Sequence, residues 1–280
     1  MISIITAIYN QLDMNRLYWE YLQKYTDNPF ELIIIDNNSN DGSREFFQSL
    51  PNNVKVITNS ENYSYPYCQN QGIAVAKYDI LAFLNNDLLL SPHWDSRALE
   101  VLGKNGREVI SFGSNDRIYN RKVTRSLHNR WKYIKYPCIY LFGQKSFSLK
   151  LMQHLCYGDW DRFSDKIYNK YGLSLTEGFS GASIVMTRKG VEILEAWDPA
   201  QQAADFDLYY KTCQRWEQYG DIKPLAVVNG IFTHHYRRLT LYSNYPPFTD
   251  KDNLSSLEKK WSVVDRVRWN IALDEFTETF

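Results

Sequence analysis

The stretch Ile80–Leu90, ILAFLNNDLLL, decides how this chain is interpreted. The apolar residues Leu81 to Leu84 predict a buried strand, but the run then meets two carboxamides and a carboxylate before three leucines follow. An uncompensated charge is costly to bury, so Asp87 needs either solvent or a positively charged partner. We therefore expect Asp87 at the exposed end of a buried strand, beside a group that takes its charge.

Short apolar runs alternate with helical patterns through the first 116 residues. Strands this apolar, separated by helices, are typical of a parallel sheet that is covered on both faces. Asp13 is a candidate cap for the first helix. The predicted strands cover residues 2–9, 30–36, 53–59, 78–86 and 108–114, and the predicted helices cover residues 13–25, 41–50, 65–76 and 92–104.

Residues 117–158 have a different character. They contain nine Lys or Arg and no Asp or Glu, with Tyr, Trp and Phe interleaved, and they show no clean period. Two interpretations stay open. Either the segment is an irregular, solvated insertion, or residues 117–150 form a basic, aromatic surface that meets an anionic acceptor or a membrane face.

Regular patterns return in the C-terminal part of the chain. A small-residue turn with a short strand and a helix comes first, then a helix that begins at its acidic end, as the helix dipole favours. A strand then leads into a basic loop that contains His234 and His235, and the tail predicts one amphipathic helix. In order, these elements cover residues 178–197, 205–220, 222–238 and 253–276. The predicted apolar stripe of the tail helix comprises Leu257, Trp261, Val264 and Arg268.

Composition argues against several classes of protein. The 32 Lys and Arg balance the 32 Asp and Glu, so no net field favours nucleic acid. The four cysteines have no metal-binding spacing and predict reduced thiols. The N-terminus enters a strand at once, and no apolar run reaches the ~20 residues of a membrane span. We therefore expect a cytoplasmic protein, with peripheral contact at the inner face of the membrane as a further option.

Polar side chains gather where three of the predicted strands end. Residues 6–10 follow the first strand, residues 36–42 the second and residues 85–87 the fourth. Because ligands bind outside the carboxyl ends of parallel strands, these groups predict one crevice. No G-x-G-x-x-G motif follows the first strand, and no G-x-x-x-x-G-K-[ST] motif occurs. A diphosphate could instead be held by a divalent cation, for which Asp87 supplies an oxygen ligand.

Four segments together resemble a known family: SIITAIYN (3–10), LIIIDNNSNDGS (32–43), ENYSYPYCQNQGIAVAKYDILAFLNND (61–87) and ADFDLYYK (204–211). They are similar to the inverting family-2 glycosyltransferases of GT-A fold. The resemblance implies an α/β fold with a Rossmann-like, mostly parallel central sheet, helices on both faces and a C-terminal helical extension. It also implies three parts: a nucleotide-sugar-binding half (1–116), an acceptor-binding and catalytic half of the same domain (117–245) and a helical tail (246–280).

The resemblance implies that the nucleoside is held by the loop after the first strand and by the aspartate that ends the second. Asp36 could accept the N3–H of uracil or thymine, which favours a UDP- or dTDP-sugar. An Asx-turn or a helix cap would also place an aspartate there. The implied nucleotide-binding residues are Thr6, Ala7, Tyr9, Asp36, Asn70, Asn86 and Asp87.

Asp87 matches the last position of the family's D-x-D motif, where a divalent cation, Mn²⁺ or Mg²⁺, joins the donor diphosphate. Asn85 replaces the first aspartate of that motif and is a neutral, weaker ligand. In relatives a histidine beyond the last core strand completes the ligand shell, which implies His234, with His235 as the alternative. A satisfied surface imidazole would look the same in the sequence, and a structural role for Asp87 also stays open.

Asp205 matches the family's catalytic carboxylate at a helix start. Inversion needs a base opposite the leaving diphosphate and within reach of the acceptor hydroxyl. The glutamate that usually precedes this residue is Ala204 here. A helix cap without chemistry is the alternative role for Asp205. Asp207 is the second candidate for the base, and Asp159 and Asp161 form the next acidic cluster.

The resemblance implies a metal-dependent, inverting hexosyl- or deoxyhexosyltransferase. It would move a sugar from a nucleoside diphosphate to a hydroxyl of a glycan or glycolipid, in the synthesis of a bacterial-type surface polysaccharide or lipopolysaccharide. A sugar-nucleotide pyrophosphorylase would instead carry a glycine-rich, basic loop after the first strand, which TAIYNQ is not. A degenerate GT-A domain that binds nucleotide-sugar or glycan without turnover also stays open, favoured by Asn85 and Ala204.

Overall fold

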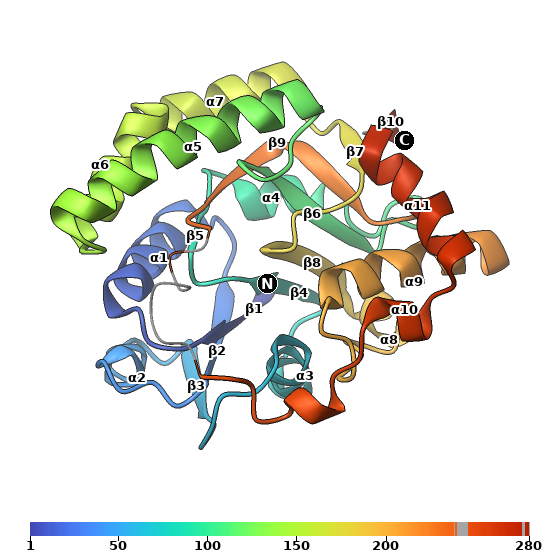
Figure 1. Ribbon diagram of the computed structural model, residues 1–280, viewed down its shortest axis with the longest axis horizontal. Coiled ribbons are helices and arrows are strands. Elements are labelled where there is room, and N and C mark those ends of the chain that lie inside the picture. Colours follow the sequence, from blue (N-terminus) through green and yellow to red (C-terminus); the bar gives the residue numbers. More distant parts are fainter. Residues whose placement is uncertain (238, 240–245, 276–277, 280) are drawn as a thin grey trace.

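The apolar run before Asp87 forms a central strand of the sheet, β4 (Ile80–Leu84). It pairs in parallel with β1 (Ile2–Ile8), which pairs in parallel with β2 (Phe30–Asp36). The computed structural model describes residues 1–237, 239, 246–275 and 278–279. In that part of the chain one sheet runs through the molecule with helices on both faces, as the sequence predicts (Figure 1).

The sheet is mixed but mostly parallel along its N-terminal half. Its order is β10-β7-β9-β6-β8-β4-β1-β2-β3, and β5 pairs with β9. The strands β3, β2, β1 and β4 are parallel, whereas β8 lies antiparallel between β4 and β6. The remaining strands are β3 (Val54–Thr58), β5 (Leu88–Leu89), β6 (Val109–Ser114), β7 (Leu175–Glu177), β8 (Ser183–Thr187), β9 (Ala226–His235) and β10 (Glu278–Thr279).

The core has two layers because side chains alternate across a strand. Ile4 of β1 packs toward one face of the sheet and Ile5 toward the other. The first face is covered by α1 and α4 to α7, and the second by α3, α8, α9 and the C-terminal helices. The helices are α1 (Leu12–Tyr25), α2 (Ser43–Gln48), α3 (Tyr65–Val75), α4 (Trp94–Leu99), α5 (Arg121–Phe142), α6 (Ser146–Tyr157), α7 (Trp160–Tyr171), α8 (Arg188–Ile193), α9 (Ala204–Tyr219), α10 (Leu257–Lys260) and α11 (Val263–Glu275).

The interpretation of residues 117–158 as an irregular insertion is wrong. Most of this segment forms α5 and α6, which lie side by side as a helical hairpin (Figure 1). The Asn120 side chain caps α5 by accepting a hydrogen bond from the N–H of Val123. The buried positions of α5 include Lys135 beside Leu127 and Trp131, so a charged residue interrupts the apolar stripe. This interruption hides the helical period.

Two details of the predicted helices are also wrong. Asp13 does not cap α1: it lies in the first turn, and Asp41 Oδ2 accepts the hydrogen bond from the N–H of Leu12 at 2.9 Å. The tail forms two helices rather than one, because the chain turns at Trp261 and Ser262 and α11 starts afresh. Residues 238 and 276, at the ends of the predicted basic loop and tail helix, lie outside the described residues.

The expected stripe of the tail is not formed either. Trp261 is 6 % exposed whereas Val264 is 74 % exposed, so the two residues do not share a buried face. The helical extension itself is confirmed. No helix among the described residues combines the length and the apolarity that crossing a bilayer requires.

Candidate active site

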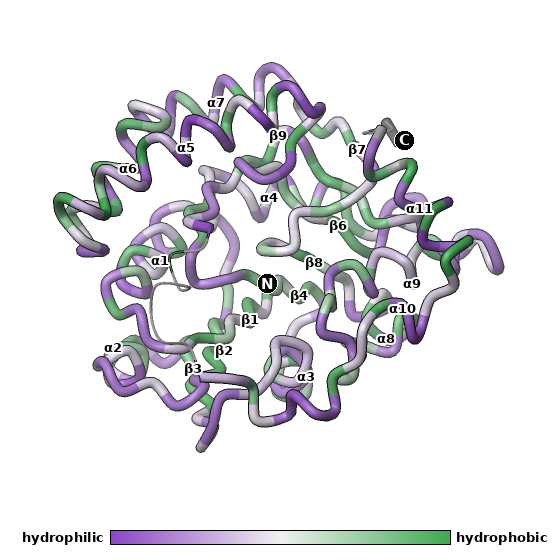
Figure 2. Tube along the Cα trace, viewed as in Figure 1, coloured by the Kyte–Doolittle hydropathy of each residue, from purple (hydrophilic) through white to green (hydrophobic). Residues whose placement is uncertain are grey.

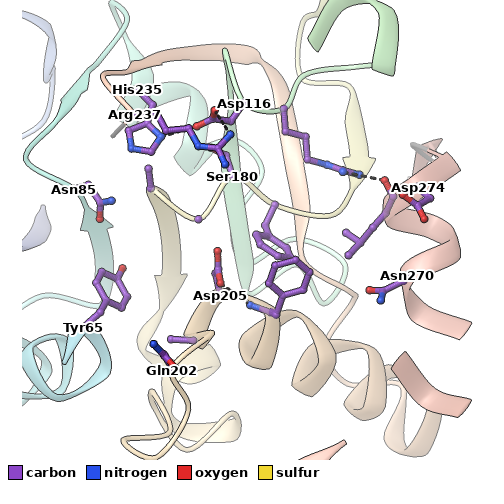
Figure 3. Close-up of a pocket in the computed structure, with 17 residues that line it drawn as sticks. Tyr65, Asn85, Asp116, Ser180, Gln202, Asp205, His235, Arg237, Asn270 and Asp274 are labelled. Carbon is purple, nitrogen blue, oxygen red and sulfur yellow. Dashed lines mark hydrogen bonds and ion pairs between the residues drawn. The ribbon is translucent and has the colours of Figure 1, made fainter. Parts of the chain in front are cut away.

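A cavity of about 710 Å³ opens at the carboxyl edge of the sheet (Figure 3). Its walls come from the end of β4, the residues that follow β6 and β9, the turn before β8, the start of α9 and α11. The polar residues that line it include Asn85, Asp116, Asp205, His235 and Arg237.

Asp205 points into this cavity from the first turn of α9, toward the side on which His235, Asp116 and Arg237 lie (Figure 3). Its Oδ1 accepts a hydrogen bond from the N–H of Phe206 at 2.9 Å. Burial raises the pKa of the Asp205 carboxyl above its usual range, more than this hydrogen bond lowers it. A carboxylate that is costly to ionise and faces a cavity has the character of a proton acceptor.

Asp207 occupies a different environment from Asp205, although it lies two residues further along α9. It is 2 % exposed and accepts a hydrogen bond from Trp261 Nε1 at 2.8 Å. Lys260 Nζ lies 2.8 Å from its Oδ1, so its charge is compensated. Asp207 therefore anchors the C-terminal helices to α9 and does not line the cavity among the described residues.

Asp87 lies beside a histidine at the edge of the cavity. Its Oδ2 is 3.3 Å from His235 Nε2, because Leu88 of β5 pairs with His235 of β9. His235 Nδ1 in turn lies 2.5 Å from Asp116 Oδ2. Burial opposes the charge on the imidazole, but the attraction of Asp87 and the hydrogen bond to Asp116 outweigh it and raise the pKa of His235 to about 10. The opening expectation that Asp87 has a partner for its charge agrees with this geometry. The expectation that Asp87 is exposed is wrong: it is 8 % exposed, and His235 packs against its carboxylate.

The structure does not bring His234 to Asp87. Its side chain is fully buried, and its Nδ1 lies 2.9 Å from the hydroxyl of Tyr157. Its ring packs edge-on against Trp131 and Tyr236. Burial lowers the pKa of His234 to about 3 and keeps the ring neutral. Since neighbouring residues of a strand face opposite sides, only His235 can turn toward the site.

The residues around Asp87 suit a divalent cation. Asp87 Oδ1 is buried and has no hydrogen-bond partner among the described residues. His235 Nε2 faces Asp87, while its other ring nitrogen is held by Asp116, which is the usual support of a metal-binding histidine. Binding of a cation would require Nε2 to release the proton that it shares with Asp87, because only a neutral imidazole nitrogen is a metal ligand. Three such ligands are not grouped around one point in the described part of the chain, so Asp87 and His235 would need oxygens from the ligand to complete a shell.

Six of the seven predicted nucleotide-binding residues lie near the ends of β1, β2 and β4, whereas Asn70 lies in α3. Most of their polar groups already have partners. Thr6 Oγ1 bonds to the hydroxyl of Tyr18, and Asn86 Nδ2 donates to Asn15 Oδ1. Asn70 bonds through both carboxamide atoms to the main chain of Trp197. Thr6 is fully buried, whereas Ala7, Tyr9, Asn70 and Asn86 are partly exposed.

Asp36 is fully buried at the end of β2. Its Oδ1 accepts from the N–H of Ser39 at 3.0 Å, and its Oδ2 accepts from Arg44 Nε at 2.6 Å. The hydrogen bond from Ser39 shows that Asp36 also has the alternative role, closing the turn that follows β2. A carboxylate has about four lone-pair sites, so these two bonds do not use all of its acceptor capacity. The side chain is fully enclosed, so a ring N–H could reach it only after its neighbours move.

The sequence can now be compared with known proteins. A model described as "Glycosyl transferase family 2" matches residues 3–171, more than half of the chain. The chain belongs to glycosyl transferase family 2. As a family-2 member it shares segments with glycosyltransferase AglE of Haloferax volcanii, 28 % identical over 116 residues that make up 39 % of this chain and 38 % of AglE. It also matches the O-antigen chain rhamnosyltransferase WbaN of Salmonella anatum, 33 % identical over 102 residues, 36 % of this chain and 31 % of WbaN.

The matched segment thus spans about a third of the length of these curated relatives. Solved structures extend the likeness of fold over most of the chain. The structure of S. aureus TarS 1–349 with UDP-GlcNAc has a TM-score of 0.52 at 15 % identity and covers 88 % of this chain and 61 % of its own. GalNAc-T7 with UDP, GalNAc and Mn²⁺ has a TM-score of 0.56 at 14 % identity, with coverage of 88 % and 45 %. The family-2 chain therefore has the GT-A fold that its motifs imply.

Several residues of the candidate site are not predicted by the sequence analysis. Asp116 lies two residues after the end of β6, so the rule that locates polar groups at the other strand ends would also find it. Asn115 bonds through its carboxamide to both the C=O and the N–H of His235 and fixes the main chain there. Asn270 and Asp274 of α11 line the cavity, and no sequence pattern predicts that contact.

Proposed function

We propose that this chain is an inverting glycosyltransferase that moves a sugar from a nucleoside diphosphate to a hydroxyl group. One observation carries the proposal. A buried carboxylate, Asp205, faces across one cavity from His235 and Asp116 (Figure 3). Asp87 Oδ2 lies 3.3 Å from His235 Nε2. A sugar bound between the two sides would have its diphosphate near Asp87 and its opposite face toward Asp205. This is the arrangement that inversion requires.

In the proposed step Asp205 accepts the proton of the acceptor hydroxyl. The acceptor oxygen forms a bond to the anomeric carbon while the bond from that carbon to the diphosphate oxygen breaks, and the electron pair leaves with the nucleoside diphosphate. The site cation, Mn²⁺ or Mg²⁺, would supply Lewis-acid stabilisation of the diphosphate charge. Asp87 and His235 are the residues that would hold it, and Asp116 would orient His235.

The proposed donor is a UDP- or dTDP-sugar, because Asp36 retains the capacity to accept a ring N–H. The residues proposed to hold it are Thr6, Ala7, Tyr9, Asp36, Asn70, Asn86 and Asp87. Residues 1–116 would then bind the donor, residues 117–245 would supply the base and the acceptor site, and residues 246–280 would close the cavity. Binding of a UDP-sugar by TarS and the Mn²⁺ of GalNAc-T7 support this assignment by analogy only.

The proposed acceptor is a hydroxyl of a glycan or glycolipid, and the transferred sugar is a hexose or deoxyhexose. The name of the Salmonella relative, an O-antigen chain rhamnosyltransferase, supports a role in surface polysaccharide or lipopolysaccharide synthesis. The proposal includes the cytoplasmic location expected from the sequence. Contact of residues 117–150 with a membrane face is part of it and is narrowed below to particular side chains.

The test is donor turnover by the purified chain. We expect metal-dependent hydrolysis of UDP- or dTDP-sugars, lost in Asp205→Asn while nucleotide binding persists. Asn85 and Ala204, the two departures from the family pattern, favour a second candidate, a domain that binds nucleotide-sugar without turnover. Tight binding of UDP without any release of sugar, in the presence of Mn²⁺ and a panel of glycan acceptors, would favour that candidate.

A further inference from the structure

We propose that the tip of the α5–α6 hairpin docks on a lipid bilayer whose headgroups are anionic. The hairpin tip is defined by Tyr140, Leu141, Phe142 and Phe147. The turn between the two helices lies at the periphery of the molecule, away from the sheet (Figure 1). The surface has no part in the transfer step, so failure of membrane binding would remove the membrane contact from the proposed function but leave the proposed transfer reaction untouched.

The hairpin tip exposes more apolar surface than a solvated turn needs. Tyr140 is 89 % exposed, Leu141 65 %, Phe142 47 % and Phe147 68 %. Phe142 and Phe147, from the two helices, stand with their ring centroids 6.2 Å apart, so the apolar side chains are contiguous. In Figure 2 this outlying end of the two helices carries apolar (green) as well as polar (purple) residues. Contiguous exposed apolar groups mark a surface that another phase or partner covers.

Tyrosines extend this surface along α5. Tyr133 and Tyr136 are 76 % and 45 % exposed and lie about two turns and one turn before Tyr140, on the outer side of the helix. Tyrosine has an apolar ring and a polar hydroxyl, and it favours the level of the headgroups at a membrane surface. The sequence along α5 thus passes from interfacial side chains to fully apolar ones at the tip.

Uncompensated positive charge lies at the tip and along α5. Lys145 is in the turn at the tip, Lys132 lies about two turns before Tyr140, and Lys122 and Arg125 lie at the other end of α5. All four are exposed, and none makes an ion pair with a described residue. Two other cations of the segment are paired, Arg121 with Asp274 and Lys150 with Glu20. Since residues 117–158 contain no Asp or Glu, the field above the hairpin is positive. Exposed apolar side chains with uncompensated cations beside them, here Lys145 and Lys132, match an anionic bilayer.

The same charges argue against a second copy of the protein as the binding partner of the hairpin tip. Two hairpin tips in contact would bring Lys132 and Lys145 of both copies together, and like charges in an interface weaken it. A bilayer supplies negative headgroups for the cations and acyl chains for the apolar tip at once. We therefore infer that the binding partner of the hairpin tip is a lipid bilayer.

A second cavity lies between the middle of α5 and Arg237. It has a volume of about 310 Å³ and is lined by α5 side chains, among them His128, Lys132 and Lys135. Arg237 also lines the cavity that contains Asp205, so the two cavities share one wall residue.

The test is sedimentation of the full chain with vesicles of phosphatidylcholine, with and without about one third phosphatidylglycerol. We expect binding to the anionic vesicles that weakens steeply from low to physiological ionic strength. Lys132→Gln with Lys145→Gln should lower binding on the order of 25-fold, about fivefold per cation. Leu141→Ser and Phe147→Ser should each lower it on the order of tenfold.

Matched controls distinguish binding through the hairpin tip from nonspecific adsorption of the protein to vesicles. Val264→Ser with Val267→Ser removes exposed apolar groups from α11, and Lys55→Gln with Lys104→Gln removes exposed cations elsewhere. Both controls should bind anionic vesicles like the parent. The proposal is overturned if tip variants and parent bind equally, or if the tip instead mediates self-association that its variants abolish. Titration of the protein with UDP and Mn²⁺ in the absence of vesicles measures the affinity of the donor site independently of membrane binding.

Discussion

Gly181 and Asp205 fit together only because Gly181 has no side chain: a Cβ there would lie 2.2 Å from Asp205 Oδ2. The turn before β8 therefore limits the positions that the Asp205 carboxylate can occupy. We expect Gly181→Ala to move the Asp205 carboxylate and to lower turnover about 100-fold, since misplacement of a reacting group by ~1 Å has effects of that size. Nucleotide affinity should stay unchanged, because Gly181 is remote from Asp36. The measurement is kcat together with the Kd for UDP, and turnover at the parent's level would show that Asp205 is not the base.

Asp205→Asn should lower turnover roughly 10²–10⁴-fold, the usual range for loss of a general base. The amide keeps the size of the side chain, and it can still accept from the N–H of Phe206. Donor titration should give the parent's affinity. If Asp205→Asn retains turnover, the base must be sought elsewhere, and Asp159 and Asp161 would be examined next.

Asp207→Asn is the matched control on the same helix. The amide can keep the hydrogen bond from Trp261 Nε1 but loses the ion pair with Lys260. We expect a loss of about 1–3 kcal/mol in the free energy of unfolding, with kcat preserved. Thermal and urea unfolding measure the first quantity and steady-state kinetics the second. The reverse pattern, a stable but inactive Asp207→Asn, would exchange the roles of the two aspartates.

The raised pKa of Asp205 gives a pH dependence with a definite sign. The folded protein favours the protonated carboxyl, so this group contributes stability below the pKa of an unfolded aspartate, about 3.9, and that contribution is lost as the pH rises through the folded pKa. Turnover has the opposite requirement, because the base must be ionised. The acid limb of kcat should therefore lie above the pKa of an ordinary aspartate.

The same linkage predicts the stability of the amide variant. Asp205→Asn should unfold at a temperature equal to or above that of the parent at neutral pH, because it removes a buried ionised group. Calorimetric scans across the acid range test this. A parent that becomes less stable than the variant only as the pH falls would contradict the sign of the shift.

The proposed cation site predicts different effects on metal dependence for substitutions of His234 and His235. Asp87→Ala should abolish metal-dependent turnover, and EDTA should do the same to the parent. His235→Ala should weaken Mn²⁺-dependent binding of UDP about tenfold or more, the effect expected for a ligand or its support. His234→Phe should leave that dependence intact, although its buried ring makes some loss of stability expected. Titration calorimetry of UDP with and without Mn²⁺ measures each; equal dependence in all variants would refute the site.

Asp36 predicts a preference among nucleotides. Uracil presents an N3–H donor to the carboxylate, whereas cytosine presents an acceptor, so UDP should bind about ten- to a hundredfold more tightly than CDP. Asp36→Asn should narrow the difference, and its stability must be measured in parallel because Arg44 loses an ion pair. Equal affinities for UDP and CDP in the parent would remove Asp36 from the base site.

The strands of the donor half could be predicted because β1, β2 and β4 are buried on both faces and appear as continuous apolar runs. Asp205 could be placed because its helix start has a recognisable motif. The choice between His234 and His235 could not be made, since it depends on the register of β5 against β9, in which Leu88 faces His235. No rule that uses the sequence alone supplies the register of a non-local pairing.

Other parts of the site depend on tertiary contacts of the same kind. The position of β8 between β4 and β6 brings Gly181 to Asp205, and residues far apart in the chain make that contact. In α5 the buried Lys135 masks the helical period, so the hairpin was missed although its charge and aromatic content were noticed. Local patterns thus predict elements, and long-range packing assembles the cavity.

The wall that α11 contributes to the cavity has a consequence for how such enzymes diversify. The family-2 match ends at residue 171, whereas Asn270 and Asp274 belong to a segment joined to α9 through the contact of Trp261 with Asp207. Under the proposed function, changes in this C-terminal segment would alter which acceptor fits without changing the strands proposed to hold the nucleotide. Substitutions confined to α11 would then change the glycosidic linkage made from one donor.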